Sequence, residues 1–241
     1  METIVFDTPQ LLGKEAATRA AAYLNQAIAE KGAARFLLST GLSQFEFFNH
    51  IINEPIDWRK VEVFHLDEYV GIAENHPASF VKYIKDRLLR FITPKQAYLV
   101  DNTGNIQENI AYLTEQIRKA PIDVAMIGIG ENAHVAFNDP PADFDTKESF
   151  IIVRLDEKCR QQQVGEGWFE HVGQVPEKAV TMTVFQIMQS RHILSCVPHR
   201  EKARAVKKTI EMDVTNEVPA TILKTHPSWT LLLDRESASL L

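Results

Sequence analysis

The chain has 241 residues, 45% of them hydrophobic, which is enough to bury a sizeable core, and we expect one domain over residues 1–241. Its 32 acidic and 26 basic side chains give a net charge of −6, which argues against a nucleic-acid partner. No segment approaches the roughly 20 apolar residues of a membrane span, and the first residues lack the basic and apolar regions of a secretory signal. We therefore expect a cytoplasmic protein with neither a nucleic-acid nor a membrane partner.

The first predicted element is a long helix, followed by alternating short apolar runs and helical patterns. Thr8 offers a capping hydroxyl, Pro9 suits the first turn, and the alanine-rich stretch 11–30 ends at Gly32. The apolar runs cover residues 35–38, 61–66, 124–129, 192–197 and 229–233, and helical patterns cover 45–52 and 77–91. This alternation predicts an α/β fold with a mostly parallel sheet and helices on both faces.

Polar segments follow three of the predicted strands, where an open parallel sheet binds its ligands. The first, residues 39–43, offers hydroxyls and a permissive glycine at Ser39, Thr40, Gly41 and Ser43, next to the start of a helix. This composition suits an anion such as phosphate. The alternative is a plain turn in which Ser43 caps the following helix.

Asp67 and Glu68 directly follow the apolar run that ends at residue 66. A carboxylate at the rim of a sheet can be partly desolvated and can act as a general base. The alternative is that either side chain caps the next turn. We interpret His65 as a core residue rather than a metal ligand.

His134 is a single titratable ring in an otherwise apolar stretch, with Glu131 and Asp139 on either side. This setting favours a proton shuttle, although a buried histidine with satisfied hydrogen bonds is the commoner case. Gly128 and Gly130 resemble a dinucleotide-binding fingerprint only weakly, because a third glycine is absent.

Arg160 and Lys202 are candidate phosphate partners, since a guanidinium and an ammonium both complement a dianion. The alternative is that each solvates a helix face. Residues 164–169, in which two glycines flank Glu166, form either a mobile lid or a surface turn. The two cysteines, Cys159 and Cys196, are far apart and are interpreted as ordinary thiols, with neither a disulfide framework nor a zinc site.

Together these segments resemble the glucosamine-6-phosphate deaminase family, which shares a superfamily with 6-phosphogluconolactonases and sugar-phosphate-sensing domains. The most specific pieces of the match are LDEYVG at 66–71, the block 128–140 that ends in AFNDP, and a late segment, PATIL at 219–223, which His226 and Pro227 follow closely. The match is ordered along nearly the whole chain. The resemblance implies a modified Rossmann-like α/β fold and the conversion of glucosamine 6-phosphate to fructose 6-phosphate and ammonia.

The resemblance also implies roles for individual residues. Asp67 would move a proton from C2 to C1 of the opened sugar as general base, and His134 would assist ring opening as acid and base. Phosphate and substrate contacts would come from Ser39, Thr40, Gly41, Ser43, Glu68, Gly130, Arg160 and Lys202. Such chemistry needs no metal and no organic cofactor, because the substrate's own carbonyl or imine stabilises the charge.

The sequence departs from the family pattern near His134. Many members carry aspartate where Asn132 stands, glycine where Ala133 stands and glutamate where Asp139 stands. We keep Asn132 and Asp139 in the catalytic set and expect activity to survive.

The alternatives are a related enzyme, either a galactosamine-6-phosphate deaminase or a 6-phosphogluconolactonase-like hydrolase, and a non-catalytic sugar-phosphate-binding protein. In each case the partner is a small sugar phosphate, and assembly into a homo-oligomer is compatible with the sequence.

Overall fold

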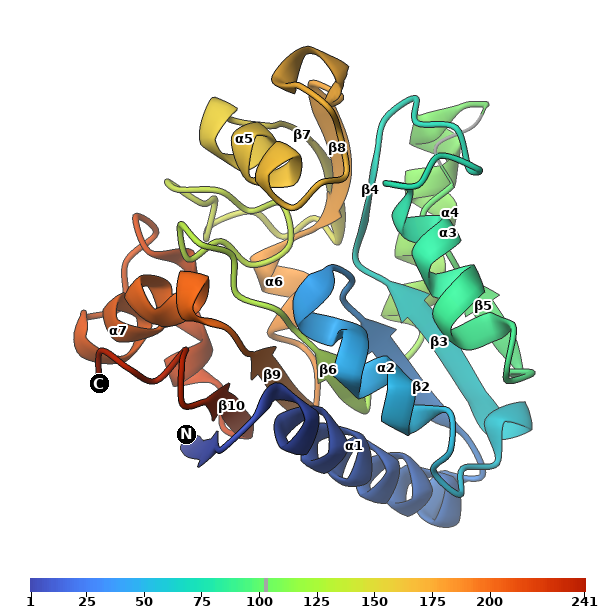
Figure 1. The fold of residues 1–241 in the computed structure, drawn as a ribbon. Coiled ribbons are helices and arrows are strands. Elements are labelled where there is room, and N and C mark those ends of the chain that lie inside the picture. The colour runs from blue at the N-terminus through green and yellow to red at the C-terminus, as the bar shows by residue number, and fades with distance from the viewer. Residues whose placement is uncertain (102–103) are drawn as a thin grey trace.

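Among the residues that the structure describes, 1–101 and 104–241 of a computed structural model, seven strands form a central sheet (Figure 1). Their order is β1-β10-β9-β6-β2-β3-β5, and all neighbouring pairs are parallel. The strands are β1 (Glu2–Phe6), β2 (Ala34–Leu38), β3 (Val61–His65), β5 (Gln96–Tyr98), β6 (Val124–Met126), β9 (His192–Val197) and β10 (Trp229–Asp234). The predicted α/β class with a mostly parallel sheet is confirmed.

The first predicted helix is confirmed as α1 (Pro9–Lys31). The Thr8 hydroxyl accepts a hydrogen bond from the Leu11 amide at 3.3 Å, and proline occupies the first turn. Gly32 ends the helix with a φ of 79°, a left-handed conformation that glycine adopts without steric cost.

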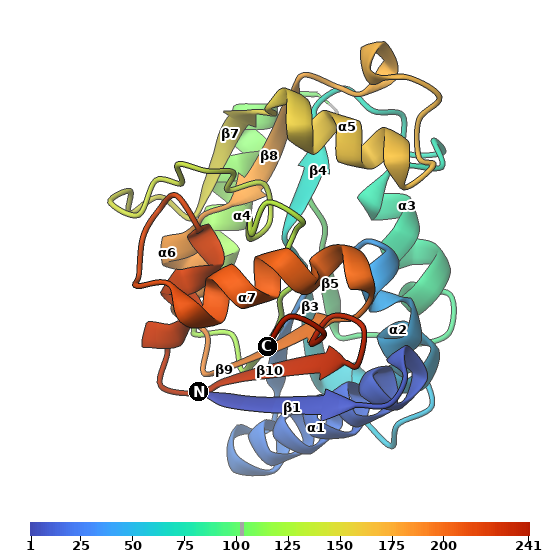
Figure 2. The same cartoon turned by 60° about the vertical axis from the view of Figure 1, so that its left-hand side comes forward.

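Both faces of the sheet are buried along its central strands, which explains their unbroken apolar runs. On β2, Phe36 and Leu38 join the core under α1, α2 (Phe45–Ile51) and α3 (Phe80–Ile84), whereas Leu37 joins the core on the opposite face. That second face is covered by α4 (Ile106–Arg118), α6 (Val184–Ile187) and α7 (Ala203–Glu211). Figure 2 shows α7 lying across β9 and β10.

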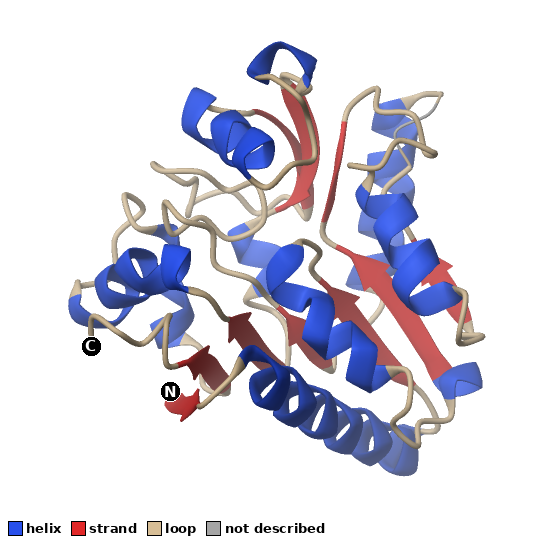
Figure 3. Cartoon of the chain, in the orientation of Figure 1, coloured by secondary structure: helices blue, strands red, loops and turns tan. Residues whose placement is uncertain are grey.

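A second sheet of three antiparallel strands was not predicted from the sequence. Its order is β4-β8-β7, with β4 (Asp67–Tyr69), β7 (Phe150–Arg154) and β8 (Lys178–Met182). Because only Leu66 separates β3 from β4, this sheet stands beyond the carboxyl ends of the parallel strands (Figures 1 and 3). Helix α5 (Glu157–Gly165) packs against it through a core that includes Cys159, Tyr69 and Phe137.

Two predicted elements differ in extent. The run 124–129 is a strand only as far as Met126, because the following residues turn back on themselves and the Gly130 amide donates to the His134 carbonyl at 3.0 Å. The predicted helix 77–91 comprises α3 and a π-helical turn, Lys85–Leu89. Within the described ranges, no helix is both long and apolar enough to cross a membrane.

Candidate active site

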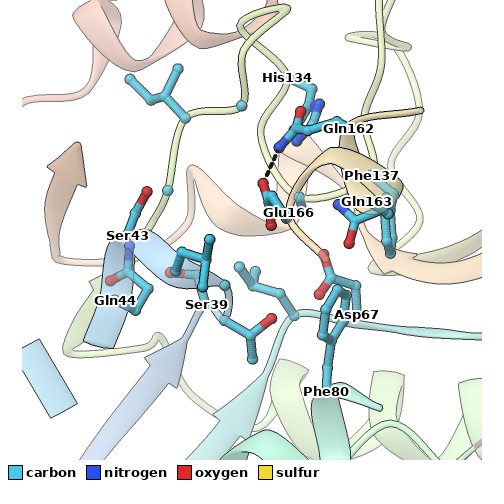
Figure 4. A pocket seen from close by; sticks show the side chains of 18 of the residues that line it. Ser39, Ser43, Gln44, Asp67, Phe80, His134, Phe137, Gln162, Gln163 and Glu166 are labelled. Carbon is cyan, nitrogen blue, oxygen red and sulfur yellow. Dashed lines mark hydrogen bonds between the residues drawn. The ribbon is translucent and has the colours of Figure 1, made fainter. Parts of the chain in front are cut away.

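A cavity lies at the carboxyl ends of β2, β3 and β6, where the parallel sheet meets the smaller sheet and α5 (Figure 4). Its wall includes most of the residues proposed from the sequence. They are Ser39, Thr40, Gly41, Ser43, Asp67, Gly130, His134 and Lys202. Asp67 and His134, which are 67 positions apart in the chain, therefore line one space.

The loop after β2 supplies hydroxyl groups to the cavity. Gly41 has a φ of 97°, which favours glycine, and its carbonyl accepts a hydrogen bond from the Tyr83 hydroxyl at 3.0 Å. The buried Ser39 hydroxyl has no hydrogen-bond partner within the described residues, as expected for a group that a ligand completes. Ser43 lies inside a 3-10 turn, Leu42–Gln44, and its side chain caps no helix.

Asp67 carries the most perturbed carboxyl group that lines the cavity. Its side chain is 6% exposed. Burial, together with the negative charge of Glu68, raises the pKa of Asp67 to about 8. Raising a carboxyl pKa toward neutrality matches the requirement for a general base that works near pH 7.

Glu68 points away from the cavity, because successive side chains of a strand alternate between its faces. Its Oε2 accepts hydrogen bonds from the Ser79 hydroxyl at 2.7 Å and the Val81 amide at 2.8 Å, and its Oε1 accepts one from the Tyr69 amide. Glu68 thus organises the start of α3. The structure does not bring it into the proposed substrate-binding set, and the capping alternative describes it better.

The imidazole of His134 lies directly against Gly130. A Cβ atom on Gly130 would stand 2.2 Å from His134 Nε2, so any larger residue would displace the ring. On its other side, His134 Nδ1 lies 3.1 Å from Asp139 Oδ1. These two atoms are close, but their geometry does not meet the criteria for a hydrogen bond. Contacts of this kind in active sites commonly tighten when substrate binds.

Asn132 fixes the loop around His134. Its Oδ1 accepts a hydrogen bond from the His134 amide at 3.1 Å, and its Nδ2 donates one to Asp139 Oδ1 at 3.0 Å. Burial opposes the ionisation of Asp139, but contacts with His134, Asn132 and Cys159 outweigh it and hold the pKa of that carboxyl below its usual range. Asp139 is therefore a carboxylate at neutral pH.

The AFNDP motif is anchored to the smaller sheet. The amide group of Asn138 donates to the carbonyls of Val135 at 2.7 Å and Met182 at 2.9 Å. The Phe137 amide donates to the Thr181 hydroxyl at 3.0 Å. These bonds tie the residues after His134 to β8.

Of the two proposed phosphate partners, Lys202 lines the cavity and Arg160 does not. Lys202 is 8% exposed. Burial lowers its pKa, and the nearby carboxylates of Glu166, Glu131 and Glu201 oppose that shift. Arg160 instead donates from Nη2 to the carbonyls of Val172 at 2.7 Å and Val175 at 3.0 Å, which joins α5 to the segment after it.

Several lining residues were not proposed from the sequence: Gln44, Phe80, Phe137, Gln162, Gln163 and Glu166. Glu166 Oε1 accepts a hydrogen bond from Gln162 at 2.7 Å (Figure 4), and its Oε2 accepts one from the Trp168 indole at 3.1 Å. The glycines around residue 166 drew attention to this segment as a lid or surface turn, but nothing local in the sequence shows that its carboxylate enters the cavity.

The fold and site can be compared with known proteins. Residues 7–232 match the model of a protein family described as "Glucosamine-6-phosphate isomerases/6-phosphogluconolactonase". The chain belongs to this family. The family predicted from the three sequence segments is thereby confirmed, and Asp67 and His134 lie within two of those segments, 66–71 and 128–140.

Among the similar proteins, the glucosamine-6-phosphate deaminase of Oenococcus oeni is 34% identical to this chain over 228 residues, which cover 94% of each of the two chains. That of Lactobacillus delbrueckii subsp. bulgaricus is 31% identical over the whole of both chains. A solved structure of a monomeric glucosamine-6-phosphate deaminase superposes over all of both chains with a TM-score of 0.92 and 28% identity. A 6-phosphogluconolactonase of Shewanella baltica shares the fold, with a TM-score of 0.80, 18% identity and 97% of each chain covered.

Proposed function

We propose that this protein is a glucosamine-6-phosphate deaminase, which converts glucosamine 6-phosphate and water to fructose 6-phosphate and ammonia. The observation that carries the proposal is the meeting of Asp67 and His134 in one cavity with Lys202 and the hydroxyl loop 39–43. The names of the relatives support the same substrate. The catalytic domain in this proposal spans residues 1–241, and the protein works in the cytoplasm.

Substrate binding begins with the phosphate group. Lys202 offers a positive charge and Ser39, Thr40 and Ser43 offer hydroxyls, and both complement a dianion. The opposite end of the sugar then lies toward Asp67 and His134. Because protein atoms surround much of this space, charge interactions inside it are stronger than in bulk solvent.

His134 opens the sugar ring. Its imidazole takes the proton from the C1 hydroxyl and returns one to the ring oxygen, which leaves the open-chain aldehyde. Asp139, 3.1 Å from Nδ1, stabilises the imidazolium formed in between. Gly130 and Asn132 position the ring, through close contact and through the hydrogen bond to its main-chain amide.

Asp67 then carries the isomerisation. Its carboxylate removes the proton from C2, and the electrons move onto the C1 oxygen, which takes up a proton and gives an enolamine. The nitrogen lone pair then forms the C2–N double bond as C1 receives the proton back from Asp67, and the nitrogen releases one proton to solvent. The product is a 2-imino sugar phosphate. Water adds to its C2 and ammonia leaves, so the amino group departs without the help of a metal or an organic cofactor.

The test is ammonia release from a panel of glucosamine, galactosamine and N-acetylated 6-phosphates, with 6-phosphogluconolactone hydrolysis measured in parallel. The wild type should release ammonia from glucosamine 6-phosphate, and Asp67→Asn should lower kcat by about 10²–10⁴-fold. The exposed Asp213→Asn, outside the cavity, is the control and should not change the rate. A wild type that binds these sugars without releasing ammonia would refute the proposal, and unchanged turnover in Asp67→Asn would refute the choice of base.

The assembly state stays a prediction. The similar solved structure is described as monomeric, whereas the sequence is compatible with a homo-oligomer. Sedimentation velocity on the full chain decides between them.

A further inference from the structure

Behind the catalytic histidine, three potential metal ligands lie together. A ring nitrogen of His134, a carboxylate oxygen of Asp139 and the Cys159 sulphur are all within 4.8 Å of one another. Cys159 reaches this place from the first turn of α5, 25 positions after His134. The sequence interpretation of Cys159 as an ordinary thiol without metal ligands nearby did not anticipate this cluster.

The cluster has unused coordination capacity. Asp139 Oδ1 accepts the Asn132 amide, but the buried Oδ2 of Asp139 and Nδ1 of His134 make no well-formed hydrogen bond within the described residues. Buried polar atoms without partners are uncommon in folded proteins and often mark a functional site. Their nearest polar neighbours are the other members of the cluster, since Nδ1 of His134 lies 3.1 Å from Oδ1 of Asp139 and the Cys159 side chain also contacts Asp139. A nitrogen, an oxygen and a sulphur are thus close enough together to be offered to one ion.

The cluster is also reachable. His134 lines the catalytic cavity, and Cys159 and Asn132 line a neighbouring cavity of about 780 Å³ that shares Ser43, Glu166 and Lys202 with it. Cys159 is only 1% exposed to the surrounding solvent, so an ion would approach it through this neighbouring cavity.

We propose that His134, Asp139 and Cys159 form a binding site for a zinc ion, which inhibits the enzyme. Imidazole, carboxylate and thiolate are the ligand types that zinc prefers, and three protein ligands leave the fourth position to water. With bonds of about 2.0–2.3 Å, tetrahedral zinc separates its ligand atoms by roughly 3.3–3.8 Å. Side-chain rotations that move atoms by about 1 Å would close the observed cluster onto the ion. Binding releases the thiol proton of Cys159 to solvent, because the thiolate is the ligand.

Inhibition, which rests on the proposed function, follows from the identity of the ligands. With zinc on Nδ1, the neutral ring keeps its proton on Nε2 and has no lone pair left to take the proton of the C1 hydroxyl. A zinc-bound Asp139 also cannot stabilise an imidazolium at His134. The ion is therefore an inhibitor in this site, not a cofactor. Hard cations such as Mg²⁺, which favour oxygen ligands, should not bind there.

Cobalt titration tests the ligand set without any reference to activity, because a cobalt–thiolate bond gives a charge-transfer absorption band. The full-length wild type should show this band, Cys159→Ser should lose it, and Cys196→Ser should keep it. Cys196 is the matched control, since it is the other buried free cysteine and lies on β9. Absence of the band in the wild type, or its persistence in Cys159→Ser, overturns the proposal.

Zinc affinity provides a second measurement, which does not depend on whether the cysteine variant folds. By calorimetry with ZnCl₂, His134→Gln should weaken zinc binding at least about tenfold, since even residues behind the ligands contribute that much, and MgCl₂ should give no binding. Equal zinc affinity in wild type and His134→Gln contradicts the proposal. In ammonia-release assays, Cys159→Ser should need at least about tenfold more zinc for half inhibition. The cobalt and calorimetry experiments involve no sugar. They can therefore refute the zinc site without affecting the deaminase proposal, and the ammonia assay can refute the deaminase proposal without affecting the zinc site.

Discussion

The side-chain amide of Asn132 donates a hydrogen bond to Asp139 Oδ1 at 3.0 Å. This bond explains how the chain accommodates asparagine in the loop around His134. An aspartate at position 132 could not donate it and would bring a second negative charge to the same oxygen. Asn132 and Asp139 are therefore a matched pair, in which the amide holds the carboxylate that faces His134.

Replacing Asn132 by aspartate should destabilise the protein at pH 7. The lost donor and the new like charge should lower the free energy of unfolding by about 1–3 kcal/mol, as measured by urea denaturation. The depressed pKa of Asp139 contributes stability above the unfolded-state value and loses it as pH falls, so the deficit should shrink below about pH 4. Asn132→Ala, which removes the donor without adding charge, should cost less. Equal stability of wild type and Asn132→Asp would contradict the matched pair.

The raised pKa of Asp67 predicts how activity depends on pH. In the proposed mechanism the carboxylate is the active base, and with a pKa of about 8 it is mostly protonated at pH 7 in the free protein. The kcat/KM for glucosamine 6-phosphate should therefore rise by close to tenfold per pH unit below about 8 and level off above it. An NMR titration of the Asp67 carboxyl without substrate checks the assignment. A flat profile between pH 6 and 9 would mean that the base ionises earlier.

Gly130→Ala should impair catalysis through His134. The added methyl would stand 2.2 Å from the imidazole, so the ring must leave its place, and we expect kcat to fall by about 10–100-fold because catalysis depends steeply on geometry. Gly165→Ala is the control, since its methyl would meet nothing within 4 Å and Gly165 does not line the cavity that contains His134. Similar kcat values for the two variants would show that the contact with Gly130 does not position the ring.

Much of the site was predictable because it depends on chain order. Asp67, His134 and the loop at Ser39 each follow a parallel strand, and parallel strands bring their carboxyl ends to one edge. The sequence does not show which of two adjacent carboxylates faces that edge. Side chains alternate between the two faces of β4, and this alternation alone turns Asp67 toward the cavity and Glu68 away from it. The strand has only three residues and belongs to a sheet formed with distant segments.

The contribution of α5 to the site was not predictable in the same way. Whether Arg160, Cys159 or Glu166 turns toward the cavity depends on how this helix packs on the smaller sheet, which no local pattern specifies. The sequence favoured Arg160 for its charge. In the structure, the guanidinium of Arg160 donates hydrogen bonds to main-chain carbonyls instead. Glu166, which directly follows α5, is the charged residue of this segment that lines the cavity.

Replacing Lys202 should therefore affect substrate binding, whereas replacing Arg160 should affect stability. Lys202→Met removes the buried cation of the cavity and should raise KM for glucosamine 6-phosphate by about 10²-fold, since a charge-assisted contact contributes roughly 3 kcal/mol. Arg160→Met should instead lower the melting temperature, because it removes the side-chain donor of the Val175 carbonyl and one of the two donors of the Val172 carbonyl. Steady-state kinetics and thermal unfolding of both variants separate these effects. A larger rise of KM in Arg160→Met than in Lys202→Met would restore Arg160 as the phosphate partner.

Glu166 should weaken the binding of phosphate. Its carboxylate lines both cavities beside Lys202 and Ser43, where its negative charge acts on the lysine that we propose as the phosphate partner. Glu166→Gln removes this charge and should tighten the binding of inorganic phosphate by about five- to thirtyfold, which corresponds to about 1–2 kcal/mol of repulsion at several ångströms in a partly screened site. Calorimetry at fixed ionic strength measures it. Glu170→Gln, an exposed change of the same charge outside both cavities, should leave the affinity unchanged. If Glu166→Gln binds phosphate no more tightly than Glu170→Gln, the carboxylate does not oppose the anion and the positive charge of Lys202 is already fully available to it.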